Sequence, residues 1–104
     1  MTLKQATEEV IKQNIEVEYR PVRFIEMTKG GEEEDLKEVI SGLVLDPEVK
    51  GKILEILEKH NGKPVFIEEF IAMYHFNLPK EVIKEAIQRA KEIQESRLFY
   101  MLNR

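Results

Sequence analysis

Apolar residues from Asp46 onward recur with the period of an α-helix, in three runs: Asp46–Asn61, Phe66–Phe76 and Pro79–Ser96. The stripes predicted to face a core are Val49, Ile53, Ile56 and Leu57; then Ile67, Phe70, Ile71 and Tyr74; then Val82, Ile83, Ala86, Ile87, Ala90 and Ile93. Asp46-Pro47 is a strong helix start. The Asp side chain accepts a hydrogen bond from a backbone N–H, and Pro at the first helical position lacks an N–H that the helix would leave unbonded in any case. The pattern predicts three consecutive helices with a tight turn before the third.

The first 45 residues predict a helix–strand–helix order. Thr2 and Gln5 fit a capping box, so a helix should run to about Asn14. From Ile15 to Tyr19 apolar and polar residues alternate, which predicts a half-buried strand. After Pro21, Val22–Met27 continues as an edge or bulged strand, the alternative being two short strands divided at Arg20-Pro21.

A second helix is expected to begin within the acidic run Glu32–Asp35, after the Gly30-Gly31 turn. Acidic residues there face the positive end of the helix dipole, and the helix should end near Gly42–Leu45. An alternative role for the acidic run is a docking strip for a basic partner.

The apolar tail Leu98–Leu102 predicts a terminal strand, because Leu, Phe and Tyr suit a pleated surface. The alternative is that the third helix continues, since no Gly or Pro stops it. The predicted fold class is therefore α+β, mainly α. It forms one domain, with an extension over 1–45 and a three-helix core over 46–104.

Four segments resemble the winged-helix, or helix-turn-helix, superfamily: Lys52–Gly62, Ile67–Phe70, Leu78–Ile87 and Arg97–Tyr100. The resemblance implies that the third helix reads the major groove and that a β-hairpin wing touches the flanking DNA backbone. By position it implies nucleic-acid contacts from Lys80, Lys84, Gln88, Arg89, Lys91 and Arg97.

The distribution of charge weakens the DNA-binding interpretation. Residues 1–45 carry six Lys/Arg against ten Asp/Glu, whereas residues 46–104 carry ten of each. A dedicated DNA-binding domain usually has a basic face, because phosphate contacts supply much of the affinity. Here four glutamates are interleaved with the basic residues of the third helix: Glu81, Glu85, Glu92 and Glu95.

Composition indicates where the protein is expected to reside. Charged residues make up 35% of the chain, mostly as Lys and Glu, a balance also seen in thermophilic proteins. Cysteine is absent and no apolar run is long enough to span a bilayer, so a reducing, cytoplasmic location is expected.

Catalytic chemistry has little support. His60 and His75 are the only histidines, Ser41 and Ser96 have no nearby base, and Gly30-Gly31 lacks the context of a phosphate loop. We therefore expect no enzymatic activity, metal, cofactor, small-molecule substrate or membrane partner.

Two functions remain in view, with DNA binding placed slightly ahead. The first is an accessory protein of transcription regulation that binds double-stranded DNA through the third helix. The second is a protein-interaction module, either a homodimer or a subunit of a larger assembly, using Phe99, Tyr100 and Leu102. A third reading, an inhibitor that mimics an acidic ligand, rests on Glu32–Asp35 alone.

Overall fold

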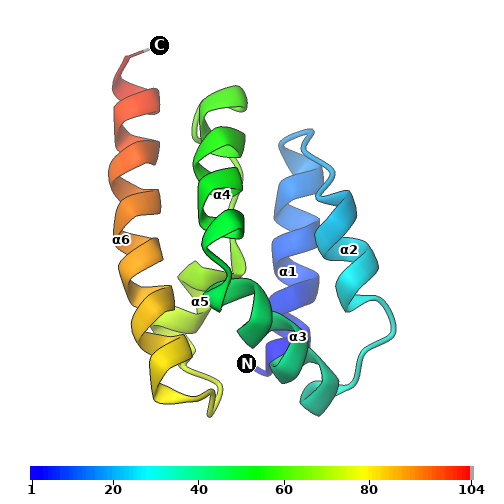
Figure 1. The fold of residues 1–104 in the computed structure, drawn as a ribbon. Coiled ribbons are helices and arrows are strands. Elements are labelled where there is room, and N and C mark those ends of the chain that lie inside the picture. The colour runs from blue at the N-terminus through cyan, green and yellow to red at the C-terminus, as the bar shows by residue number, and fades with distance from the viewer. Residues whose placement is uncertain (104) are drawn as a thin grey trace.

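A computed structural model of the chain, which describes residues 1–103, contains six α-helices (Figure 1). Their bounds are α1 Leu3–Glu16, α2 Val22–Thr28, α3 Glu33–Leu45, α4 Pro47–Lys59, α5 Ile67–Tyr74 and α6 Lys80–Leu102. No strand occurs within the described part of the chain. The predicted α+β class is therefore wrong, and the fold is all-α without a wing.

The predicted helix starts are confirmed where a side chain caps the backbone. The Thr2 hydroxyl accepts a hydrogen bond from the Gln5 N–H, and the Gln5 side chain accepts one from Thr2, at 3.1 and 2.9 Å. Asp46 accepts from the Glu48 N–H at 2.9 Å. The three helices expected after Asp46 are α4, α5 and α6.

The strand predicted over Ile15–Tyr19 and Val22–Met27 is wrong. Helix α1 continues through Ile15 to Glu16, and Glu18 then adopts a left-handed backbone with a φ of 62°. Pro21 is the N-cap residue of α2. The helix loses no hydrogen bond there, because a residue at a helix start does not need its backbone N–H for an intrahelical bond. Within α2, Phe24 and Thr28 are four residues apart and both face the interior. A helical period therefore accounts for the inward-facing residues of this segment.

The terminal strand predicted over Leu98–Leu102 is also wrong. Helix α6 runs without interruption to Leu102, and Asn103 caps it by donating its backbone N–H to Phe99. The alternative of a continued helix is thus correct. Helix propensity is a weak preference, and a helix of this length extends by adding one bond per residue.

The buried residues form two clusters. The larger joins α1, α3, α5 and the first half of α6, and includes Leu3, Ile40, Ile71 and Val82. The smaller joins α4 to the second half of α6 through Ile53, Leu57 and Ile93, with Phe66 and Tyr100 packed against it. The far end of α6 lies beside α4 at the edge of the molecule (Figure 1).

Candidate functional site

The buried stripe of α6 includes a charged residue. Val82, Ala86, Arg89 and Ile93 repeat at spacings of four, three and four, which keeps them on one helical face. The Arg89 side chain is 2% exposed. Its guanidinium donates to the carboxylates of Glu68 at 3.2 Å and Glu85 at 2.9 Å. Two further bonds reach backbone carbonyls at the junction of α3 and α4, on Leu43 at 3.1 Å and Asp46 at 2.8 Å. Arg89 is therefore a structural anchor and does not lie on a DNA-facing surface.

Glu68 is the partner of Arg89 on α5 and is itself buried. Burial raises the pKa of Glu68 above its ordinary value, because a desolvated carboxylate loses hydration, although bonding to Arg89 acts in the opposite direction. The pair holds α5, α6 and the α3–α4 junction together.

Arg97 makes a second anchor two turns further along α6. Its guanidinium donates to both carboxylate oxygens of Glu69, at 2.6 and 3.0 Å. It also donates to the carbonyls of Gly62 at 3.0 Å and Pro64 at 2.9 Å, which fixes the connection between α4 and α5. The side chain is 19% exposed, so its donors are directed into the protein.

Four of the six residues predicted to contact nucleic acid do lie at the surface. Lys80, Lys84, Gln88 and Lys91 are exposed and follow one side of α6. Glu81 and Glu95 are exposed on the same helix, and the half-buried Glu92 pairs with Lys50 of α4 at 3.0 Å. The structure thus separates four surface residues from the two arginines and leaves the surface charge mixed.

The second half of α6 exposes a set of large apolar side chains, which we call the α6 apolar surface. Its members are Leu98, Phe99, Met101 and Leu102, with exposed fractions of 59%, 59%, 48% and 81%. Helical spacing makes them neighbours, since Leu102 lies four residues after Leu98 and three after Phe99. Of the predicted partner-binding residues, Phe99 and Leu102 belong to this surface, whereas Tyr100 packs on the smaller core cluster.

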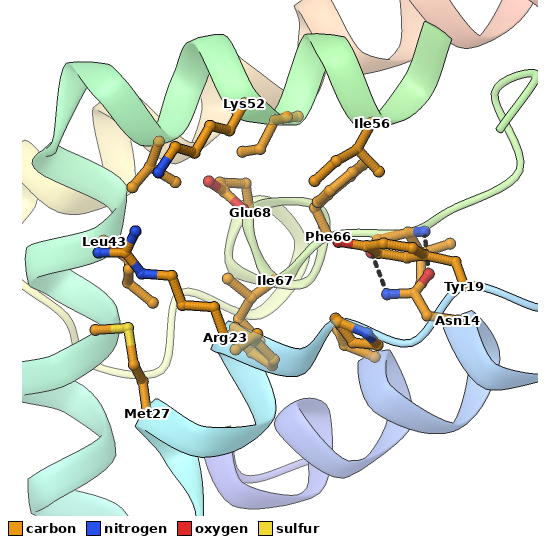
Figure 2. A pocket seen from close by; sticks show the side chains of 16 residues that line it. Asn14, Tyr19, Arg23, Met27, Leu43, Lys52, Ile56, Phe66, Ile67 and Glu68 are labelled. Atoms are coloured by element: carbon orange, nitrogen blue, oxygen red, sulfur yellow. Dashed lines mark hydrogen bonds between the residues drawn. The ribbon is translucent and has the colours of Figure 1, made fainter. Parts of the chain in front are cut away.

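A groove lies on another side of the molecule, between α4 and the α1–α2 pair (Figure 2). Its volume is about 160 Å³. Mainly apolar side chains line it: Val10, Pro21, Phe24, Met27, Leu43, Val49, Ile53, Ile56, Val65, Phe66 and Ile67. Five separate segments supply these residues, which is why no single stretch of sequence signalled the groove.

One end of the groove is closed by polar contacts. The Asn14 amide donates to the Val65 carbonyl at 2.9 Å and accepts from the Val65 N–H at 2.8 Å. The ring of Tyr19 packs on His60 with centroids 4.8 Å apart, and burial raises the pKa of the Tyr19 hydroxyl. These bonds fix the segment between α4 and α5 against α1.

Within residues 1–103, no group of three or more His, Asp or Glu side chains is placed to hold a metal ion. None of the helices described is both long and apolar enough to cross a membrane. Comparison with protein-family models, with curated proteins and with solved structures gives no match. The case for a function therefore depends on the surfaces described above.

Proposed function

We propose that this protein is a non-enzymatic protein-interaction module that self-associates through the α6 apolar surface. The observation that carries the proposal is the exposure of four adjacent large apolar side chains, from 48% to 81%. Contiguous exposed apolar groups are typical of contact surfaces, because covering them removes apolar area from water.

A symmetric pair suits this surface. In a two-fold dimer the same patch is used twice, so an apolar patch on one copy covers the identical patch on the other. The second half of α6 packs on α4 and, through Arg97, on the connection between α4 and α5, yet Leu98, Phe99 and Leu102 remain exposed, so the same helix of a second copy can cover them. Tyr100 and Ile93 on the opposite side of α6 hold the helix against its own fold.

Sedimentation velocity across a dilution series tests this proposal. We expect a reversible dimer of twice the 12.2 kDa chain mass. The double variant Leu98→Lys/Leu102→Lys should sediment as a monomer, because paired lysines would be buried without partners. Val22→Lys/Met73→Lys is the matched control, since it adds the same charge at exposed apolar positions elsewhere. A wild-type monomer at every concentration would reject self-association.

DNA binding is the second candidate, and the row of Lys80, Lys84, Gln88 and Lys91 on one side of α6 favours it. Duplex DNA should then bind at low salt and dissociate as salt rises, because phosphate contacts release counterions. The variant Lys80→Gln/Lys84→Gln/Lys91→Gln should reduce the affinity and the salt slope together. Absence of a complex at low salt would exclude this function.

A further inference from the structure

The lining of the groove includes two cationic side chains. Arg23 of α2 and Lys52 of α4 are exposed and line the groove. Neither takes part in any ion pair among residues 1–103. Figure 2 shows both side chains directed toward the end of the groove at Leu43.

Beneath these cations the groove is apolar. Val10, Ile53 and Ile67 line it and are buried, and the half-buried Phe24 of α2 and Ile56 of α4 line it as well. Water in such a groove finds few hydrogen-bonding partners, so an apolar group gains by displacing it. The volume of 160 Å³ is close to that of an engineered apolar cavity of about 150 Å³ known to admit benzene.

Asn14 and Glu68, two of the other polar residues that line the groove, are already bonded. The Asn14 amide bonds to the Val65 backbone at the closed end. Glu68 lines the groove, and its carboxylate bonds to Arg89. Among the charged residues that line the groove, the two without an ion pair in residues 1–103 are therefore Arg23 and Lys52, and their position sets the sign and the orientation of a complementary ligand.

We propose that this groove binds a small monocarboxylic acid, with an apolar part about the size of one aromatic ring in the groove and its carboxylate between Arg23 and Lys52. The proposal is separate from self-association, because the α6 apolar surface contributes no residue to the groove. The sequence alone predicted no small-molecule ligand for this chain, and the groove is the basis for proposing one.

The probe is 4-phenylbutyrate, titrated into isotopically labelled protein and followed by NMR. Saturable shifts should centre on the methyl groups of Val10, Ile53, Ile56 and Ile67, with a Kd of roughly 0.1–1 mM for a ligand of this size. The neutral amide 4-phenylbutyramide should bind about fivefold more weakly or worse, because it lacks the charge that the two cations recognise.

Variants separate the charge from the apolar contact. Arg23→Gln/Lys52→Gln should weaken the acid about fivefold or more and leave the amide within about twofold. Lys12→Gln/Lys84→Gln removes the same net charge at exposed positions outside the groove and should leave both ligands unchanged. The unfolding midpoint of each variant, measured alongside, shows whether the groove remains folded.

Three results would overturn the proposal. The first is no saturation at about 10 mM acid, tenfold above the weakest expected Kd. The second is a set of shifts centred on the α6 apolar surface. The third is equal affinity for the acid and its amide, which would show that Arg23 and Lys52 do not recognise the carboxylate.

Discussion

Two adjacent glutamates on α5 have opposite surroundings. Glu68 is buried and bonds to the buried Arg89, whereas Glu69 is partly exposed and bonds to Arg97 near the surface. Neighbours on a helix point in different directions, so each glutamate reaches α6 at a different level. The two arginines of α6 therefore join helices and are not available to a partner.

The two halves of α6 also differ in their surroundings. Around Arg89 the helix contacts α3, α4 and α5, and the ion cluster lies in the interior. Beyond Arg97 the helix exposes Leu98, Phe99 and Leu102 to solvent. The first half of α6 therefore serves the fold, and the second half supplies the proposed contact surface.

The largest expected effect comes from Arg89→Met. This change leaves Glu68 buried without its cation and removes donors from the Leu43 and Asp46 carbonyls. We expect a loss of about 3–5 kcal/mol in the free energy of unfolding, measured by urea denaturation. Arg89→Met/Glu68→Leu should recover much of that loss, because well-packed apolar residues can replace a buried ion pair. A loss below about 1 kcal/mol, typical of surface pairs, would refute the buried anchor.

Arg97→Gln should cost less, about 2 kcal/mol, since its bonds to Glu69, Gly62 and Pro64 are charge-assisted but partly hydrated. Thermal unfolding followed by circular dichroism measures the loss. If Arg97→Gln proved more damaging than Arg89→Met, the order that we assign to the two anchors would be reversed.

Glu68→Gln adds a pH test to the comparison. Burial raises the folded-state pKa of Glu68 above the ordinary 4.5, so the folded state favours the protonated carboxyl. The contribution of the Glu68 carboxyl to the free energy of unfolding is thus fully present below pH 4.5 and declines as pH rises through its folded-state pKa.

Wild type should therefore exceed Glu68→Gln in stability by about 1 kcal/mol at most in acid. The difference should shrink as pH rises above 4.5. Urea unfolding at a series of pH values gives this difference directly. A difference that grows with pH would mean that Arg89 outweighs burial in setting the pKa of Glu68.

The smallest effect is expected from Lys50→Gln. The Lys50–Glu92 pair between α4 and α6 is more than one-third exposed on both sides, so water screens it. The free energy of unfolding should change by less than about 0.5 kcal/mol. A larger loss would show that exposure does not rank the ion pairs of α6.

Sequence alone predicted the helices whose ends carry chemical signals. Asp46-Pro47, the Thr2–Gln5 box and the acidic start of α3 each match the structure. It did not reveal that the Glu33 carboxylate also accepts hydrogen bonds from the Leu3 and Lys4 N–H groups, at 2.9 and 3.1 Å. That contact joins residues about thirty positions apart, and local patterns carry no record of it.

The two strand predictions failed because short apolar stretches fit both periods. Ile15–Tyr19 alternates over only five residues, and the turn at Glu18 resolves the ambiguity in favour of helices. Leu98–Leu102 has strand-like composition, but it continues a helix already packed through Ile93 and Arg97.

The burial of Arg89 did have a signal in the sequence. It stands three residues after Ala86 and four before Ile93, on the same stripe, and Arg97 follows four residues later. A cation on an apolar stripe predicts a buried acidic partner, and Glu68 beside Ile67 meets that need.

An NMR dilution series of the labelled protein tests the division of α6 most directly. We expect the signals of the α6 apolar surface (Leu98, Phe99, Met101 and Leu102) to shift and broaden as concentration rises, while those of Lys80 and Lys84 stay unchanged. Uniformly invariant signals, or changes that centre on Lys80 and Lys84, would contradict that division.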